Sequence, residues 1–419
     1  MTESIRVLHF ADTHIGMENY GKTDPETGLS TRVVDFLRRI EEMIDYARVN
    51  DVDLVIFAGD AFKTRSPNPT YQREFAHRIR DLAQLAPVVL LIGNHDLPLT
   101  QMKASSVEIY DVLDVPNVRV SAEYEVWLQE TKRGQVVIGT APYPLRSRIL
   151  EHTKTTGMTI AETDTILQQQ LVDILDDMAE EADVIAGEFD EDIPRLLTGH
   201  FTVGGAVVGS ERSIMLGRDV AVPKITLADS RWDYVALGHI HKHQNLTADR
   251  DDAPPIVYSG SIERIDFGEE GDPKGFCWVD LARHETEWAF IKVNARPFVT
   301  LKADLREEEF PTRATVQMIE QHNLQNAVVR ILLTLSPESE SKFRENYVRE
   351  ALRRAEVFYV ATIRKEVDQP ERARLGANPE GLTHQELLER YLLSKEIPLE
   401  RRNELLEVAE ALFEEAKPK

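Results

Sequence analysis

The chain has 419 residues, 42% of them hydrophobic, so it is long enough to bury a sizeable core and to form two or three domains. Its one cysteine, Cys277, excludes an intrachain disulfide framework and a thiolate zinc cluster. Acidic residues number 72 against 49 basic ones, and the resulting net charge of -23 opposes non-specific attraction to nucleic acid. A local basic rim or bound cations can still reverse that sign at one site.

The N-terminal sequence MTESIRVLHFADTH has no basic segment followed by an apolar one. No apolar run comes near the roughly 18 residues that a membrane-spanning helix needs. We therefore expect no signal peptide and no membrane partner, and a cytoplasmic protein.

The first part of the chain alternates apolar runs with helical patterns. Strands are predicted at 5–11, 52–58 and 87–92, and helices at 33–49 and 71–86, where apolar residues recur at helical spacing. Such alternation is typical of an α/β architecture with a largely parallel sheet.

Strands dominate from about residue 135 onward. They are predicted at 135–143, 195–200, 233–239, 255–262, 275–281 and 287–293, and one long helix is predicted near 158–182. This pattern predicts a second sheet that packs on the first, with helices flanking both.

The character of the sequence changes near Pro297. Segments beyond it predict a small α+β domain of β-α-β-α-β type, followed by the polar, Pro- and Gly-containing stretch DQPERARLGANPEG, which predicts a linker. Two short amphipathic helices, THQELLERYLLSK and PLERRNELLEVAEALFEEA, are predicted after it, with too few apolar residues for a core of their own. The predicted divisions are 1–295, 296–367, 368–382 and 383–419.

The stretch YVALGHIHKHQ holds three histidines directly after a predicted strand. Residues two apart in an extended chain point the same way, so His239 and His241 can face one site. His243 lies beyond them and is predicted to be a surface residue.

Polar side chains follow four other predicted strands as well. In sheets of this kind functional groups gather beyond the carboxyl ends of strands, so these side chains are expected to converge on one pocket. They are Asp12 and His14, then Asp60, then Asn94, His95 and Asp96, and then His200.

These residue types favour metal chemistry. Oxygen and nitrogen ligands without thiolates suit manganese, iron, zinc or magnesium. So many candidate ligands exceed what one tetrahedral ion needs, but two ions that share one carboxylate would use them. Two such ions clamp the attacking and leaving oxygens of a phosphoryl displacement, so phosphoester hydrolysis is the natural reaction.

The order D-x-H, GD, GNHD, H and GH-x-H resembles the calcineurin-like metallophosphoesterase superfamily. ADTHIG, GDAFKTRSPNP, IGNHD, TGHFTVGG, VALGHIHKHQ and YSGSIERIDFGE further resemble the SbcD-type nucleases of bacterial double-strand-break repair, which are related to the eukaryotic meiotic-recombination nuclease family. The resemblance implies a two-sheet sandwich flanked by helices (the metallophosphoesterase fold), a small capping domain for DNA binding at 296–367, and a helical tail.

The resemblance also implies the site residues. Asp12, His14 and His241 would hold one metal ion and Asn94, His200 and His239 the other, with Asp60 bridging. His95 would protonate or stabilise the leaving oxygen, and Asp96 would orient His95. The two ions would most often be Mn²⁺, and Lys63 and Arg65 would contact DNA. Some relatives carry histidine where Lys63 stands, which leaves the balance of exonuclease and endonuclease activity open.

As a function, the resemblance implies a double-strand exonuclease and single-strand endonuclease in DNA break and hairpin processing. The implied partners are DNA, an SbcC-type ABC ATPase whose coiled coil receives the tail, and a second copy of the chain within a heterotetramer associated with the nucleoid. Tail helices that fold back on their own domain are the alternative.

The alternative function is another calcineurin-like phosphoesterase, either a protein phosphatase or a cyclic-nucleotide phosphodiesterase. GDAFKTR lacks the Asp-Arg-Gly that usually follows GD in the phosphatases. A metal-free scaffold that only recruits an ATPase would leave the polar cluster unexplained.

Overall fold

The computed structural model describes residues 3–98, 104–151, 153, 155–189, 192–209, 220–250, 252–368, 383–395 and 397–415. The chain divides into two compact units. The first comprises Met1–Thr300, Leu324–Val329 and Glu356–Ala361, and the second comprises Leu301–Asn323, Arg330–Ala355 and Thr362–Lys419. Apart from Asp368, the predicted linker 368–382 lies outside the described residues.

Six strands form the first sheet, in the order β12-β11-β1-β2-β3-β4. The four strands from β1 to β4 run parallel, whereas β11 and β12 are antiparallel additions on the other side of β1. Their bounds are Ile5–Phe10 (β1), Leu54–Phe57 (β2), Val88–Leu91 (β3), Val118–Ser121 (β4), Gly275–Leu281 (β11) and Glu287–Lys292 (β12).

The second sheet also has six strands, in the order β5-β6-β7-β8-β10-β9, and β6, β7, β8 and β10 are parallel. Their bounds are Glu125–Thr131 (β5), Gly134–Ala141 (β6), Arg195–His200 (β7), Tyr234–Gly238 (β8), Gln244–Asn245 (β9) and Ile256–Tyr258 (β10). One prediction is wrong: the segments 275–281 and 287–293 belong to the first sheet. There β11 pairs along the edge of β1 and satisfies hydrogen-bonding groups that would otherwise be exposed.

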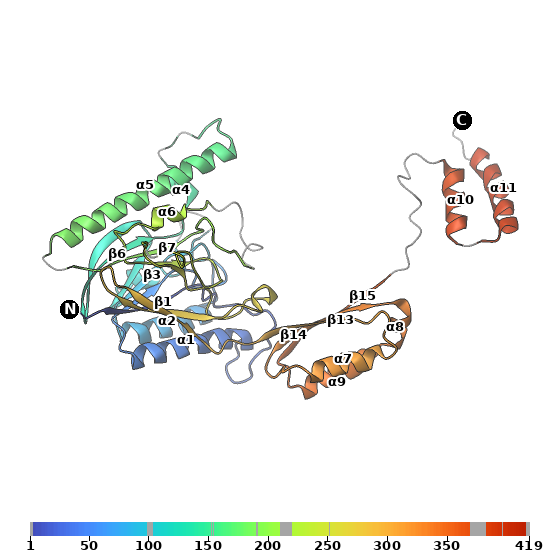
Figure 1. The fold of residues 1–419 in the computed structure, drawn as a ribbon, viewed down its shortest axis with the longest axis horizontal. Helices are drawn as coiled ribbons and strands as arrows, with labels where there is room; N and C mark the ends of the chain where they lie inside the picture. The colour runs from blue at the N-terminus through green and yellow to red at the C-terminus, as the bar shows by residue number, and fades with distance from the viewer. Residues whose placement is uncertain are drawn as a thin grey trace. The chain divides into compact units, whose positions relative to one another are not determined.

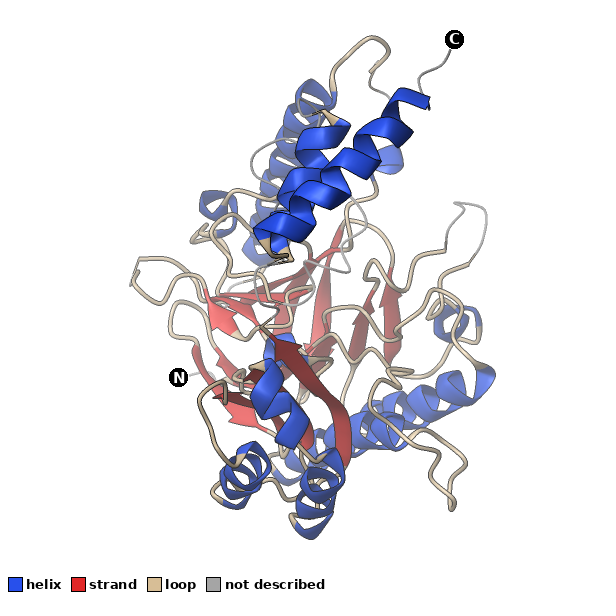
Figure 2. Cartoon of the chain, turned by 90° about the vertical axis from the view of Figure 1, so that its right-hand side faces the viewer, coloured by secondary structure: helices blue, strands red, loops and turns tan. Residues whose placement is uncertain are grey.

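The two sheets pack face to face because successive side chains of a strand point to opposite faces of its sheet, one toward the other sheet and the next toward the outer helices. On β1, Ile5 and Val7 face the second sheet, whereas Leu8 and Phe10 face the helices outside the first. The helices α1 (Thr31–Val49) and α2 (Pro69–Ala83) cover the first sheet, and α5 (Ile160–Gly187) covers the second (Figure 1). Figure 2 draws the strands in red and the helices in blue. Because helices pack on the outer face of each large sheet, the predicted two-sheet sandwich flanked by helices is confirmed.

The long helix α5 begins where the sequence provides a capping box. The side chain of Thr159 accepts from the Glu162 backbone, and the Glu162 side chain accepts from the backbone of Thr159. The helix extends five residues beyond the predicted end at 182, to Gly187. Short helices are α3 (Ile109–Val112), α4 (Arg146–Ile149), α6 (Lys224–Leu227) and the 3₁₀ turn η2 (Phe267–Glu269).

A polar contact joins the sheets inside this apolar layer. His9 of β1 is fully buried, and its Nε2 lies 3.2 Å from the carbonyl oxygen of Leu237 on β8. A carbonyl only accepts, so Nε2 carries the proton and Nδ1 accepts from the Tyr234 hydroxyl at 3.1 Å. His9 stands three residues before Asp12, and Leu237 two residues before His239. The contact therefore fixes the relative position of two strand ends that carry candidate site residues.

The small sheet has the order β13-β14-β15, formed by Phe298–Asp304, Val328–Leu335 and Tyr359–Val367. Its helices are α7 (Pro311–Glu320), α8 (Pro337–Lys342) and α9 (Glu345–Arg354). The helices α8 and α9 are separate because Phe343, which lies between them, is buried in an extended backbone conformation.

The C-terminal helices α10 (His384–Ser394) and α11 (Leu399–Glu415) pack against each other, and both were predicted (Figure 1). A capping box of Thr383 and Glu386 starts α10. Large apolar side chains stay exposed on this pair: Tyr391, Leu393, Leu399 and Val408. Within the described ranges, no helix combines the length and apolarity needed to cross a membrane.

Candidate metal centre

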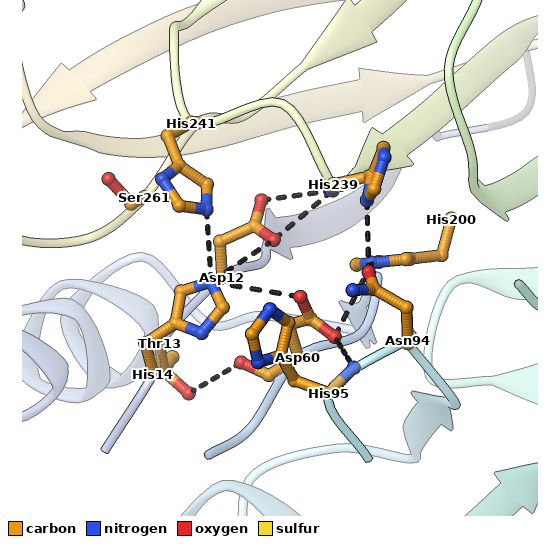
Figure 3. A network of polar contacts seen from close by, with 12 residues as sticks. Asp12, Thr13, His14, Asp60, Asn94, His95, His200, His239, His241 and Ser261 are labelled. Carbon is orange, nitrogen blue, oxygen red and sulfur yellow. Dashed lines mark hydrogen bonds and ion pairs between the residues drawn. The ribbon is translucent and has the colours of Figure 1, made fainter. Parts of the chain in front are cut away.

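The polar residues predicted to converge do so, at the carboxyl ends of five strands. Asp12 and His14 follow β1, Asp60 follows β2, Asn94 and His95 follow β3, His200 ends β7, and His239 and His241 follow β8. Figure 3 shows their side chains turned toward a common centre. They meet because parallel strands of each sheet end at the same edge, and the packed sheets bring the two edges together.

The chain turns sharply at these strand ends. Four of the residues have left-handed backbone: Asp12 at φ 52°, His14 at 37°, Asp60 at 63° and His239 at 90°. Such conformations cost free energy for residues with a Cβ, and they gather at sites where the surrounding structure enforces them. Here they aim each side chain inward immediately after its strand.

Gly59, which precedes Asp60, could not be another residue. Its φ is +97°, and a Cβ there would lie 2.4 Å from His200 Nδ1. The glycine lets the backbone of the β2 loop pass directly against the ring of His200.

Three residues form a first group on the side of β1 and β8. Asp12, His14 and His241 each offer a ligand atom, and these atoms lie within 4.8 Å of one another. The Nε2 atoms of His14 and His241 are 3.0 Å apart. All three side chains are buried, with residue exposures of 0%, 3% and 4%.

A second group centres on the amide of Asn94. Its Oδ1 lies 3.1 Å from His200 Nε2 and 3.0 Å from His239 Nδ1. Asp60 reaches both groups: its Oδ1 lies 3.4 Å from His200 Nε2, and its Oδ2 lies 3.7 Å from His14 Nε2.

Hydrogen bonds fix the tautomers of two rings. His200 Nδ1 lies 2.6 Å from the carbonyl oxygen of Ala58, and His241 Nδ1 lies 3.0 Å from Glu269 Oε1. A carbonyl and an ionised carboxylate only accept, so both Nδ1 atoms donate and each neutral ring keeps its lone pair on Nε2. Those Nε2 atoms face the cluster, as metal ligation by imidazole requires.

The charges of the cluster also favour cations. Burial raises the pKa of Asp12. Burial acts on Asp60 in the same way, but neighbouring imidazoles, His200 first, outweigh it and hold its pKa well below the usual range. The Asp60 carboxylate in turn overcomes burial at His200 and raises its pKa to about 9. In this structure, protons on the imidazoles thus offset the negative charge of the buried carboxylates. Divalent ions could replace those protons, because oxygen and nitrogen donors suit such ions.

His95 stands beside the two groups. Its backbone N–H donates to Asp60 Oδ1 at 2.8 Å, and its Nδ1 lies 2.8 Å from the carbonyl oxygen of Lys63. Nδ1 therefore donates, and Nε2 is the nitrogen left for chemistry. His14, Asp60 and His95 also place ligand atoms within 4.8 Å of one another, so proximity alone does not separate a ligand from an acid at this position.

The prediction that Asp96 orients His95 is wrong. The buried Asp96 carboxylate accepts from the backbone N–H groups of Asp60 at 2.9 Å, Ala61 at 3.0 Å and Gly93 at 3.0 Å. The Lys63 carbonyl holds the ring of His95 instead. Burial and the charge of Asp60 raise the pKa of Asp96 to about 7. Asp96 therefore ties the loops after β2 and β3 together beneath the site.

A pocket of about 330 Å³ opens over the cluster. Besides the site residues it is lined by Met17, Asn19, Lys63, Ile265 and Asp266. Lys63 thus borders the cluster as a phosphate contact would, whereas Arg65 is not part of the lining.

Sequence reasoning missed Glu269, the partner of His241. It ends the motif YSGSIERIDFGE and is fully buried. Burial is not visible in the sequence, so the acidic residue within this motif was the signal available. His243 was predicted to be a surface residue, but it is partly buried. Its ring stacks on Phe290 at a centroid distance of 3.9 Å, and its Nδ1 lies 2.9 Å from the carbonyl oxygen of Tyr258. It belongs to the packing of the sandwich.

The chain is similar in sequence to known proteins. The chain is 26% identical to the SbcD component of nuclease SbcCD from Bacillus subtilis (strain 168) over 307 residues, which cover 71% of this chain and 72% of that protein. It is 29% identical to the protein of the same name from Escherichia coli (strain K12) over 312 residues, 72% of each chain. A solved dimetal phosphatase from Danio rerio is similar with a TM-score of 0.40 and 10% identity, over 69% of this chain and 99% of that one.

The family model described as "Calcineurin-like phosphoesterase" matches residues 5–243, more than half of the chain and every residue of the cluster described above. The chain belongs to the calcineurin-like phosphoesterase family.

Proposed function

We propose that this protein is a metal-dependent DNA nuclease, the nuclease component of an SbcCD-like complex. The observation that carries the proposal is the pair of donor groups with Asp60 between them, set under a pocket at the strand ends. Similarity to two proteins named as components of nuclease SbcCD supports a nucleic acid among phosphoester substrates, and the proposal takes it to be DNA.

In this proposal Asp12, His14 and His241 hold one ion, Asn94, His200 and His239 hold the other, and Asp60 bridges them. Two divalent ions, most often Mn²⁺, would polarise the phosphoryl group and lower the pKa of an attacking water. The protein supplies the fixed geometry: His200 and His241 are locked in the required tautomer, and Asp96 holds the β2 and β3 loops together.

His95 acts as the acid in this scheme. Its Nδ1 is occupied by the Lys63 carbonyl, so a proton on Nε2 is the one that it can give to the departing sugar oxygen. Deoxyribose alkoxide is a poor leaving group, and its departure needs such a donor.

DNA contact is proposed for Lys63, at the edge of the pocket, for Arg65, and for a capping domain at 296–367. The net charge of -23 makes such local contacts and the metal ions necessary, because the whole chain repels a polyanion. Double-strand exonuclease and single-strand endonuclease activities in break and hairpin processing are proposed.

The tail at 383–419 is proposed to dock on the coiled coil of an SbcC-type ABC ATPase. Exposed apolar side chains on α10 and α11, Tyr391 and Val408 among them, favour a protein partner. Two copies of the chain would join two ATPases in a heterotetramer on the bacterial nucleoid in the cytoplasm.

One set of assays tests the proposal. Purified protein is incubated with Mn²⁺ and linear double-stranded DNA, hairpin DNA, a phosphopeptide or a cyclic nucleotide. DNA cleavage that disappears with EDTA and returns with Mn²⁺ is expected. Hydrolysis of the phosphopeptide or cyclic nucleotide without DNA cleavage would favour another phosphoesterase of the same family.

A further inference from the structure

Glu269 touches the candidate centre through His241. It is fully buried in the turn η2, and its Oε1 lies 3.0 Å from His241 Nδ1. Its other oxygen accepts from the backbone N–H of Ile265 at 3.0 Å. Both carboxylate oxygens are thus engaged, and the side chain has one orientation toward the ring.

Lys274 neutralises this carboxylate within the protein. Its Nζ lies 2.8 Å from Glu269 Oε2, and neither side chain is exposed to solvent. A buried carboxylate without such a partner would be costly, and its charge would be lost by protonation.

Lys274 also holds the backbone of His241. Its Nζ donates to the His241 carbonyl oxygen at 3.1 Å and to Ser261 Oγ at 2.7 Å. The backbone N–H of Ser261 donates to the same carbonyl at 3.1 Å. This approach requires Gly260, because its φ is +74° and a Cβ there would lie 2.7 Å from the His241 carbonyl oxygen. The segment after β10 therefore contacts both the ring of His241, through Glu269, and its backbone carbonyl, through Ser261 and Lys274.

The second donor group is held differently. Its His200 is oriented by a neutral group, the carbonyl of Ala58. A carboxylate makes the opposite nitrogen of an imidazole a stronger ligand than a carbonyl does, and partners of this kind change metal affinity by about 10- to 100-fold.

We propose that Glu269 is a positioning residue for His241, and that the buried Glu269–Lys274 pair selectively strengthens metal binding at the group of Asp12, His14 and His241. The inference rests on the proposed two-metal function. It predicts that the two sites differ in metal affinity. The affinity of the site that contains His241 depends on Glu269, a residue that contacts neither substrate nor metal.

The test is Glu269→Gln, which keeps the shape and an oxygen for His241 but removes the charge. Mn²⁺ binding is measured on the full chain by titration calorimetry and by electron paramagnetic resonance, which distinguishes single from spin-coupled ions. One of two Mn²⁺ dissociation constants should rise by about 10- to 100-fold while the other changes little. Excess Mn²⁺ should restore nuclease turnover, because Glu269 takes no part in the reaction itself.

Glu263→Gln is the matched control. Glu263 lies in the same segment, is equally buried, and pairs with Arg32 at 3.8 Å instead of with a site residue. Its replacement should leave both Mn²⁺ dissociation constants within about twofold. If Glu269→Gln alone does not fold because Lys274 loses its partner, Glu269→Gln with Lys274→Met removes both charges and carries the same expectation.

Equal weakening of both ions, or no weakening of either, would overturn the inference while leaving the proposed nuclease intact. A wild-type chain that binds no Mn²⁺ would overturn the two-metal proposal and the inference with it. Melting temperatures in EDTA separate damage to the fold from loss of metal affinity.

Discussion

His14 and His241 point their Nε2 atoms at each other across 3.0 Å, although 227 residues separate them in the chain. Glu269 occupies Nδ1 of His241, so the neutral His241 ring has only a lone pair to offer at Nε2. Ligand atoms about 2.1 Å from one ion and at a right angle lie about 3 Å apart. The two rings are therefore spaced as neighbouring ligands of a single metal ion.

Replacement of the residue between the two groups tests the centre as a whole. Asp60→Asn should lose both ions and all hydrolysis, because neither group keeps its geometry without the shared carboxylate. Metal content by mass spectrometry and the rise in melting temperature on adding Mn²⁺ are the measurements. Wild type should gain about 2.7 kcal/mol of stability at 100 times the dissociation constant, and the variant none.

Asp233→Asn is the control for that experiment. Like Asp96, Asp233 is a buried carboxylate that accepts from backbone N–H groups. Asp233 precedes β8, whereas the site residue His239 follows β8, so the two lie at opposite ends of that strand. Its replacement should affect stability alone. Full two-metal occupancy in Asp60→Asn would refute the bridging role.

His95→Ala separates an acid from a ligand. It should keep both ions and DNA affinity, and should lose DNA hydrolysis by about 10²- to 10⁴-fold. An aryl phosphodiester, with a more acidic leaving group, should lose much less. His241→Ala should instead weaken metal binding. Loss of metal from His95→Ala, or equal slowing of both substrates, would place His95 in the ligand shell, a position that its distance from His14 and Asp60 also permits.

Lys63 should contribute one phosphate contact. Lys63→Ala, made in the inactive His95→Ala background, should weaken DNA binding for all sequences alike and reduce the slope of log K against log salt concentration by about one. Arg65→Ala is the comparison, and a smaller effect is expected because Arg65 does not line the pocket. Fluorescence anisotropy over a salt series measures both slopes. An unchanged slope in the Lys63 variant would contradict the contact.

The buried contact of His9 with Leu237 predicts that the stability of the fold depends on pH. Burial lowers the pKa of His9 from its ordinary value near 6.5 to about 3, with the Leu237 carbonyl opposing and His243 adding to the effect. The folded protein then binds fewer protons than the unfolded chain between these values. Stability from His9 is present above about pH 6.5 and falls by about 1.4 kcal/mol for each pH unit below it.

His9→Gln should flatten this dependence, because glutamine does not titrate. The free energy of unfolding by urea is measured in EDTA from pH 4.5 to 7.5, so that bound metal does not contribute. His322→Gln, at an exposed histidine, should leave the wild-type slope in place. Identical slopes for wild type and His9→Gln would show that His9 is not held neutral by the fold.

Removal of residues 383–419 should leave basal nuclease activity, since the candidate site residues all lie before the end of β9. It should abolish binding to the ATPase, because the tail is the proposed docking element. Co-purification with an SbcC-type ATPase measures the second effect. A milder variant, Leu399→Asp with Val408→Asp, should also lose binding, and Glu407→Ala, at an exposed acidic position, should not. A shortened chain that still co-purifies would contradict the docking role of the tail.

The sequence by itself determined nine of the twelve strands of the two large sheets, all except β4, β5 and β9, and the polar residues at the ends of five of those nine. The mostly apolar run IRVLHF predicts a strand that is buried on both faces, and only Arg6 of β1 is less than fully buried. Motifs such as GNHD place side chains at a strand end whatever the rest of the chain does. The layered α/β architecture follows from the same local patterns, because amphipathic strands and helices have few ways to cover one another.

Tertiary structure decided the rest. The edge that β11 joins, the partner of Asp96 and the partner of His241 all depend on which segments meet in space. Sequence proximity suggested that Asp96 serves His95, but a buried carboxylate binds whatever donors surround it, and three backbone N–H groups surround this one. Glu269 and Lys274 likewise acquire a role only because Gly260 brings their segment against His241. Such pairings between distant segments leave no mark on local periodicity, so the patterns that predicted the strands and helices did not predict these three contacts.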